Sequence, residues 1–239
     1  MLDRKLHIGE ASKYLGVSID TLRRWDKSGK LPAKKSSGGH RYYSYQDLDL
    51  YRQDIFALAT KWVLGKSVEP KSEFYSPTST GFKERLSKLQ TALEKLEILE
   101  EYYPLIVAVT GEIGNNSYDH NLGNWPNISG IFFAFDINKK QVALADRGLG
   151  ILRTLRRVRP NIENDESALH TAFTEILSGR APEARGNGLK FVREVVLNNL
   201  LKLDFHSGNA RVIIEGNSNK IKFSTTDVYY SGCLALLTF

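Results

Sequence analysis

The segment Glu112-Ile-Gly-Asn-Asn-Ser-Tyr-Asp-His120 decides the fold of the larger part of this chain when it is read with two short segments that follow it. The second segment is Asp146-Arg-Gly-Leu-Gly150, and the third is Arg185-Gly-Asn-Gly-Leu189. In a helix, the acid, the amide and the imidazole at the first, fifth and ninth positions of the first segment would project from nearly one face. We therefore expect these side chains to share a cleft with the aspartate turn and the glycine strip.

The residue types of the second and third segments suit a purine nucleotide. The carboxylate of Asp146 can accept a hydrogen bond from an adenine amino group, and Gly148 and Gly150 let the backbone approach a ligand closely. Gly186 and Gly188 can open a helix whose free N–H groups face phosphate. One such segment alone is commonly a solvated helix face or a turn, but three in this order favour a nucleotide site.

Two expected strands bring the aspartate to the edge of a sheet. Residues 131–135 and 141–145 form apolar runs separated by a turn over residues 136–140. Asp146 then emerges at the end of the second strand, where a ligand carboxylate belongs. Further strands are expected in the tail, over Val212–Ile214, Ile221–Ser224 and Leu234–Phe239.

The order and spacing of the three segments resemble the GHKL superfamily of ATPases and kinases, which includes DNA gyrase, heat-shock chaperones, histidine kinases and mismatch-repair proteins. The resemblance covers roughly residues 82–239. It implies the Bergerat-type ATP-binding fold, a two-layer α/β sandwich whose mixed sheet carries helices on one face, and it implies ATP and Mg²⁺ as ligands. One departure is Gly232-Cys233, where many members have Gly-Thr near the adenine.

The same resemblance implies a role for each segment. Asn116 would bind Mg²⁺, Glu112 would be the general base that activates the hydrolytic water, and Asp146 would hold the adenine. Residues 151–184 would form a lid, in which the cluster Arg153, Arg156, Arg157 and Arg159 could meet phosphate or DNA or could be a solvated helix face. The implied nucleotide-binding set is Asn116, Asp119, His120, Asp146, Gly148, Gly150, Arg185, Gly186, Gly188 and Leu189.

A second pattern opens the chain. Residues 8–15 have apolar side chains at helical intervals and end at Gly16, and Ser18 is a good N-cap for a second helix that carries Thr21-Leu-Arg-Arg-Trp25. This helix-turn-helix pattern resembles the MerR-type and excisionase-like winged-helix domains, through Ile8-Gly-Glu-Ala, Gly16-Val-Ser, Thr21 to Trp25 and Gly39-His-Arg-Tyr42. The resemblance implies that the second helix enters the major groove of DNA and that residues 34–43 form a wing along the backbone. The implied DNA contacts are Thr21, Arg23, Arg24, Lys34, Lys35, His40, Arg41 and Tyr42.

Charge supports a nucleic-acid reader independently of any family. Residues 1–62 contain 12 Lys and Arg against 7 Asp and Glu, a net charge of +5, whereas residues 63–239 contain 21 against 20, a net charge of +1. A concentrated positive face is what phosphate binding with counterion release requires. The nearly neutral remainder argues against general adhesion to nucleic acid.

Length and composition agree with two compact units. The 239 residues exceed one typical domain, and 41% apolar content permits a real core. We expect an all-α winged helix-turn-helix over residues 1–62, a linker over residues 63–81 and the ATP-binding domain over residues 82–239, an α+β chain as a whole. The helix after Ser44 is expected to run on through Trp62. A single cysteine, Cys233, and no apolar run of membrane-spanning length favour a cytoplasmic protein that does not bind a membrane.

Oligomerisation is open at this level. Phe82, Leu86, Leu89, Leu93 and Leu96 recur at alternating steps of four and three residues. This stripe could pair two chains or could cover the sheet of its own domain, and the second arrangement is slightly favoured because Glu100 interrupts the repeat. A homodimer by some surface is still expected, because one small reader contacts too little DNA for specificity.

Three functions fit these patterns. The leading hypothesis is a sequence-specific DNA-binding transcription regulator whose second domain binds ATP and ADP as a switch. The alternative is a DNA-tethered enzyme, either a slow ATPase with Glu112 as base or a Ser/Thr protein kinase of the anti-sigma-factor type acting on an unknown protein partner. Autophosphorylation is disfavoured because no histidine lies in the helix expected over residues 82–103. A third reading is an interaction platform without nucleotide.

Overall fold

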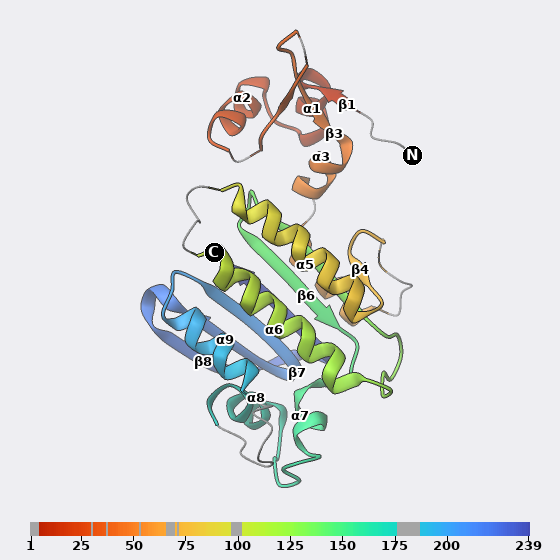
Figure 1. The fold of residues 1–239 in the computed structure, drawn as a ribbon, viewed down its shortest axis with the longest axis vertical. Coiled ribbons are helices and arrows are strands. Elements are labelled where there is room, and N and C mark those ends of the chain that lie inside the picture. Colours follow the sequence, from red (N-terminus) through yellow and green to blue (C-terminus); the bar gives the residue numbers. More distant parts are fainter. Residues whose placement is uncertain are drawn as a thin grey trace.

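The computed structural model describes residues 5–29, 31–36, 38–52, 54–65, 70, 72–96, 102–175 and 187–239. It combines helices with two antiparallel sheets, one of three strands near the N-terminus and one of five strands. The small unit lies at one end of the molecule in Figure 1, and the large sheet with its helices forms the rest. Among the described residues, no helix has both the length and the apolar character needed to cross a bilayer.

The N-terminal unit contains the two expected helices, α1 (Ile8–Leu15) and α2 (Ile19–Lys27), joined at Gly16 and Ser18. The hydroxyl of Ser18 accepts a hydrogen bond from the backbone N–H of Thr21 at 3.1 Å, so the predicted N-cap is present. The expectation of an all-α unit was wrong, because three short strands form a sheet in the order β1-β3-β2. These strands are β1 (Lys5–His7), β2 (Lys34–Lys35) and β3 (Arg41–Ser44).

The expected single helix after Ser44 is two helices. The first, α3 (Tyr45–Arg52), packs in the N-terminal unit through the fully buried Leu48. The second, α4 (Ile55–Leu64), begins at Asp54, whose carboxylate accepts hydrogen bonds from the backbone N–H groups of Phe56 and Ala57. An acidic N-cap starts a new helix here because it satisfies donors that a continuous helix would have paired internally.

Helix α4 buries its apolar face on the large sheet rather than in the N-terminal unit. Its buried residues cluster with small and aromatic side chains of the sheet, namely Ala134, Ala143, Ala145 and Phe132. Alanines in the strands let the helix approach the sheet closely. The expected domain boundary after residue 62 therefore runs through a helix that packs on the second unit.

The large sheet has the strand order β4-β5-β6-β8-β7, and every pairing within the described residues is antiparallel. The expectation of a mixed sheet was therefore wrong for this part of the chain. The two strands expected around residues 131–145 are present with the intervening turn. The bounds are β4 (Tyr75–Ser76), β5 (Ile131–Asp136), β6 (Gln141–Asp146), β7 (Lys202–Glu215) and β8 (Lys220–Thr238), with a 3₁₀ turn, η2 (Gly216–Ser218), between the last two.

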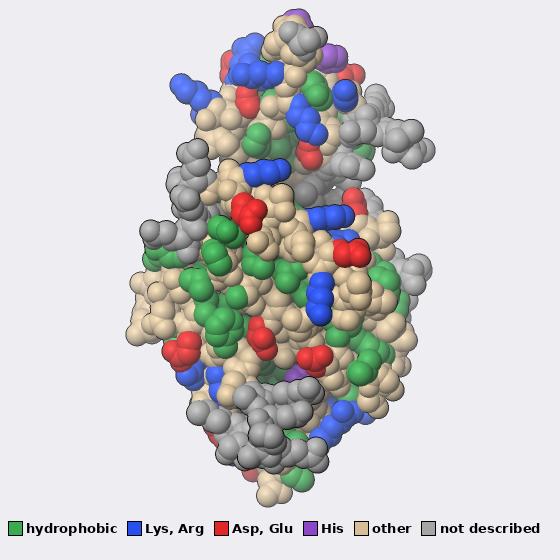
Figure 2. All heavy atoms as spheres, viewed as in Figure 1, with side chains coloured by type: hydrophobic (Ala, Val, Ile, Leu, Met, Phe, Trp, Pro, Cys, Tyr) green, Lys and Arg blue, Asp and Glu red, His purple; other side chains and the backbone are tan. Residues whose placement is uncertain are grey.

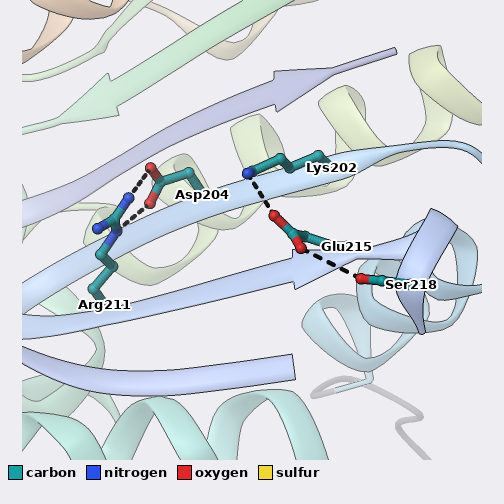
Figure 3. A network of polar contacts seen from close by, with 5 residues as sticks. All are labelled: Lys202, Asp204, Arg211, Glu215 and Ser218. Carbon is teal, nitrogen blue, oxygen red and sulfur yellow. Dashed lines mark hydrogen bonds and ion pairs between the residues drawn. The ribbon is translucent and has the colours of Figure 1, made fainter. Parts of the chain in front are cut away.

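Strand β7 reverses direction within its own length. An extended strand of 14 residues spans roughly 45 Å, yet Nζ of Lys202 lies 2.5 Å from Oε1 of Glu215 at the other end of β7. The reversal is at Gly208, where φ is +61° and the register with β8 shifts. Figure 3 shows Lys202 facing Glu215 and Asp204 facing Arg211 across the two arms. The expected strands over residues 212–214 and 221–224 lie in β7 and β8, and the arm that begins at Lys202 was missed.

Helices cover both faces of the large sheet. One face carries α5 (Ser79–Glu94), α6 (Tyr103–Asn121), α8 (Asp165–Thr174) and α9 (Gly188–Leu197), whose apolar side chains share one core with the strands. Figure 1 shows α5, α6 and α9 in front of the sheet. Because α4 packs on the opposite face, the expectation of helices on one face was wrong. The short helix α7 (Gly150–Leu155) follows β6 directly.

The apolar stripe of α5 faces its own sheet. Phe82, Leu89 and Leu93 are fully buried, and all three belong to the core that α5 shares with α6 and the strands. Of the two arrangements open from the sequence, the structure therefore has the intramolecular one.

Candidate functional site

The first segment lies on the C-terminal half of α6, as expected. Ile106, Val109 and Ile113 bury one side of this helix in the core, and this packing turns Glu112 and Asn116, both half-buried, toward the end of the sheet. Proline at the start of the helix fits the position where no intrahelical N–H bond is needed. The acid and the amide therefore reach the same end of the fold as Asp146.

A pocket opens between α6, the turn after β6 and the start of α9. Its cavity volume is small, about 30 Å³ of space that water can enter, and its mouth is open to solvent. Five residues expected from the sequence line it, namely Asn116, His120, Asp146, Gly150 and Leu189. The other lining residues were not in the expected nucleotide-binding set, although Cys233 was expected near the adenine and Ile151 and Thr154 in the lid: Ile113, Ser117, Asn121, Ile151, Thr154, Phe205 and Cys233.

Asp146 forms the floor of this pocket and is only 2% exposed. Its Oδ2 accepts a hydrogen bond from the hydroxyl of Ser117 at 2.8 Å, and its Oδ1 accepts one from the N–H of Gly148 at 2.8 Å. Burial raises the pKa of Asp146, and the hydrogen bonds that it accepts oppose this shift. Two anchored oxygens hold the carboxylate in one orientation beside the pocket.

Asn121 contacts the glycine turn after Asp146 and fixes its backbone. The sequence did not predict this role. The side-chain oxygen of Asn121 accepts from the N–H of Leu149 at 2.8 Å, and its amide donates to the carbonyl of Ser117 at 2.7 Å. A Cβ on Gly148 would lie 2.2 Å from the Asn121 amide nitrogen, so only glycine fits there. Ser117 and Asn121 are four residues apart on the helix that carries Asn116, and this spacing is the signal that could have found them.

The third segment meets the first at the start of α9. A Cβ on Gly188 would lie 1.7 Å from Oε1 of Glu112 and 3.1 Å from Nδ2 of Asn116. The acid and the amide of α6 are thus packed against the bare backbone at the N-terminus of α9. The first turn of a helix presents unpaired N–H groups there, which favour negative charge.

The remaining expected residues have different positions. Asp119 is exposed and does not line the pocket, whereas Gly148 lies behind it against Asn121. Arg185 and Gly186 lie outside the described residues, as does the part of the expected lid after residue 175. His120 lines the pocket and is exposed to solvent. Partial desolvation by the surrounding protein lowers its pKa, Asp119 opposes this shift and Arg157 adds to it.

The expected lid begins with α7 and α8, and two of its arginines are engaged within the protein. Arg156 donates to the carbonyls of Ile162 and Glu163 at 2.8 and 2.7 Å. Arg159 forms an ion pair with Glu175. These two guanidinium groups therefore have structural contacts that the sequence did not reveal.

The expected DNA contacts lie on α2 and on the β2–β3 hairpin of the N-terminal unit. Arg23, Arg24, Lys34, Lys35 and His40 are exposed, and Arg23 also pairs with the exposed Asp20 at 3.0 Å. Thr21 and Tyr42 are half-buried. Figure 2 shows Lys and Arg side chains on this end of the molecule.

Arg41 also forms an ion pair within the N-terminal unit, which the sequence did not predict. Its Nε donates to Oδ2 of Asp26 in α2 at 2.6 Å, and Oδ1 of the same aspartate accepts from the N–H of Ala33 at 2.8 Å. Asp26 therefore joins the second helix to the hairpin. The pair fixes the orientation of the hairpin cations relative to those of α2.

Comparison with known proteins finds a family at the N-terminal unit, where residues 7–43 match the model described as MerR family regulatory protein. A stretch of 63 residues, 26% of this chain, is 35% identical to the type II methyltransferase M.Eco47II of Escherichia coli. Stretches of 50 residues, 20% of this chain, are 40% identical to the HTH-type transcriptional activators TipA of Streptomyces coelicolor and Streptomyces lividans. The chain covers 15% of the length of the methyltransferase and 20% of each activator. The N-terminal unit is thus similar to the regulatory proteins of the MerR family over residues 7–43.

Proposed function

We propose that this chain is a sequence-specific DNA-binding transcription regulator and that its second unit is a GHKL-type domain that binds ATP with Mg²⁺ as a switch. The observation that carries the nucleotide part is the meeting of all three sequence segments at one pocket. Asp146 lies on its floor, Asn116 lines its wall, and Gly188 opens the adjoining helix against Glu112. Residues 112–120, 146–150 and 187–189 are distant in the chain and converge there.

The DNA-binding part of the proposal is supported by the N-terminal unit, α1 to α3 with β1 to β3, which we call the reader. Its exposed cations occupy both α2 and the hairpin, and the Asp26–Arg41 pair holds the two elements in one arrangement. The similarity of residues 7–43 to MerR regulators, and of 50 residues to a helix-turn-helix activator, favours double-stranded DNA as the partner. Phosphate contacts from Lys and Arg would set affinity, and α2 would read base edges.

The residues of the pocket fit an adenine nucleotide. Asp146 is a buried, oriented carboxylate able to accept a hydrogen bond from an amino group. The bare backbone at Gly188 lets Glu112 and Asn116 lie against the start of α9, where a Cβ would displace the carboxylate. The described residues contain no cluster of three or more His, Cys, Asp or Glu that could hold a metal by itself. Mg²⁺ would therefore be held by Asn116 together with phosphate oxygens.

Bound ATP would supply a transferable phosphoryl group and a multiply charged anion. The protein residues would orient it: Asp146 at the base, the anchored glycine turn at one side, and the N–H groups of α9 at the phosphates. Regulation requires that ATP and ADP favour different arrangements of the chain. A nucleotide that bound two arrangements with equal affinity would not shift the equilibrium between them.

The test of this proposal is a titration of the full chain with ATP and MgCl₂ by calorimetry, followed by DNA titrations with ATP, with ADP and with neither. A duplex selected from a random library by the full-length chain serves as the DNA. We expect saturable ATP binding that Asp146→Asn weakens, and a DNA affinity that depends on the nucleotide. Equal DNA affinity and stoichiometry in all three conditions would contradict the proposal that the nucleotide controls DNA binding.

An enzyme tethered to DNA is the second candidate, and Glu112 is the observation that favours it. A carboxylate next to Asn116 at the start of α9 is suitably placed to act as a general base near a phosphoryl group. The discriminating measurement is multiple-turnover phosphate release, with transfer to Ser or Thr of added protein measured in parallel. Turnover that Glu112→Ala abolishes while ATP binding persists would establish the enzyme.

We also propose that the regulator binds DNA as a homodimer, because a reader of this size contacts few base pairs. The buried stripe of α5 does not form the contact between chains. Sedimentation of the chain with and without DNA tests this, and a strictly monomeric complex on the selected duplex would exclude it.

A further inference from the structure

Arg147 follows the pocket aspartate directly, yet its side chain reaches the opposite face of the sheet. It is 5% exposed. Its Nε donates to the carbonyl oxygen of Trp62 at 2.9 Å, and its Nη2 donates to the same oxygen. The guanidinium carbon lies 4.8 Å from the centroid of the Trp62 ring. One turn of the chain therefore holds Asp146 at the pocket and fixes a cation to α4 behind the sheet.

The carbonyl that Arg147 binds belongs to the last turn of α4. The same oxygen accepts from the N–H of Gly65 at 3.1 Å, where the helix ends. The last carbonyls of a helix lack intrahelical donors, and a positive charge at this end is favourable. Arg147 thus caps α4 from the turn that borders the pocket.

Helix α4 leads directly to the DNA reader. Only residues 53 and 54 separate its first residue from the end of α3. Within the reader, the ring of Tyr51 on α3 lies 5.0 Å from that of Trp25 on α2. Ile55, Ala59, Trp62 and Val63 pack together on the sheet. A shift at the C-terminus of α4 would therefore be carried along this short helix toward the unit that holds Arg23 and Arg24.

A second contact ties the same strand to the reader at its other end. Nζ of Lys139, in the turn that precedes β6, lies 5.4 Å from the centroid of the Tyr51 ring. Strand β6 consequently meets the reader at its start and the helix leading to the reader just after its end. The contact of Lys139 with Tyr51 and the contact of Arg147 with Trp62 therefore lie on either side of β6. A movement of the pocket turn relative to the first contact would shift the second.

We propose that Arg147 is the positioning residue that couples nucleotide occupancy of the pocket to the orientation of the DNA reader. This inference rests on the proposed function, because it assumes that ATP occupies the pocket. A nucleotide that draws Asp146 and its turn inward also displaces the backbone of Arg147. The two donors held on one carbonyl pass that displacement to α4.

The experiment measures a ratio, the dissociation constant of the selected duplex without nucleotide divided by that with a non-hydrolysable ATP analogue and MgCl₂. In the wild-type chain we expect this ratio to differ from one by about 5-fold or more, a usual size for coupling between sites. Arg147→Gln should bring it close to one while the affinity for the analogue stays within about 3-fold, well under the tenfold that corresponds to about 1.4 kcal/mol. Arg147→Lys, which keeps a charge and a donor, should restore part of the ratio.

Arg85→Gln is the matched control. Arg85 also donates to backbone carbonyls, those of Ser72 and Phe133, and also lies over an aromatic ring, that of Phe133 at 5.8 Å. Neither Ser72 nor Phe133 belongs to α4 or to the pocket turn. The control should keep the wild-type ratio, so a loss specific to Arg147 is not a general effect of removing an arginine.

A measurement on the wild-type chain keeps the inference falsifiable even where Arg147→Gln does not fold. Hydrogen exchange at the C-terminal turn of α4, including the N–H of Gly65, should change when the analogue binds. Unchanged exchange there, or a full ratio in Arg147→Gln, overturns the coupling role and leaves nucleotide binding intact. Failure of the wild-type chain to bind the analogue overturns the proposed function as well, so the two failures are distinguishable.

Discussion

Gly188→Ala tests the geometry of the pocket without removing any functional group. The added Cβ would lie 1.7 Å from Oε1 of Glu112, whereas ordinary contact begins near 3.4 Å. The carboxylate would have to retreat by the difference, about 1.7 Å, and the Asn116 amide at 3.1 Å by a few tenths of an ångström. We expect affinity for ATP with Mg²⁺ to fall about 10- to 100-fold, the loss that follows when one or two charge-assisted contacts are misplaced.

The same substitution should leave the fold intact. Glycine in a helix costs roughly 0.5–1 kcal/mol relative to alanine, so the free energy of unfolding should be unchanged or slightly higher. Gly9→Ala in α1 is the control, because nothing lies within 4 Å of its added Cβ. Calorimetry and denaturant unfolding of both variants give the two quantities. Wild-type ATP affinity in a well-folded Gly188→Ala would refute the proposed position of the phosphates.

Three further predictions follow from single contacts. The pKa of Asp204 is lowered to about 2, mainly by its hydrogen bonds with His206 and Arg211 against the opposing effect of burial. The folded-state pKa lies below the unfolded one, so the ionised Asp204 stabilises the fold above pH 4 by up to about 2 kcal/mol. This stabilisation is lost as the pH falls from 4 to 2. The free energy of unfolding of Asp204→Asn, measured across this range, should not show that loss. Asp26→Ala removes the bonds to Ala33 and Arg41 and should destabilise the reader by about 1–3 kcal/mol, measured by its thermal unfolding. Arg24→Ala should weaken DNA binding and lower the salt dependence by about one ion without changing ATP affinity, and an unchanged salt slope would exclude a phosphate contact.

The sequence predicts those parts of the fold that depend on local patterns. The capping serine and the helical intervals around it give α1 and α2, and the apolar runs that flank residues 136–140 give β5 and β6. The spacing of Glu112, Asn116 and His120 gives one face of α6. These features follow from the helix and strand periods and from turn chemistry, which act over a few residues.

Features that depend on distant contacts were not predictable from those patterns. Asp54 resembles any polar residue of a long helix until α4 is seen to pack on the sheet instead of on the reader. The reversal of β7 at Gly208 depends on pairing with β8, and the reach of Arg147 to Trp62 joins residues 85 positions apart. Ser117 and Asn121 were predictable in part. Their helical spacing can be seen in the sequence, whereas their partners, Asp146 and Leu149, cannot.

The most direct test of the account is a crystal structure of the full chain with a non-hydrolysable ATP analogue and MgCl₂. We predict that the adenine amino group lies within hydrogen-bonding distance of the Asp146 carboxylate, that the metal lies beside Asn116 and that the phosphates face the start of α9. A nucleotide bound elsewhere on the chain, or a pocket closed by the side chains of Leu189 and Phe205 at saturating analogue, would contradict the account.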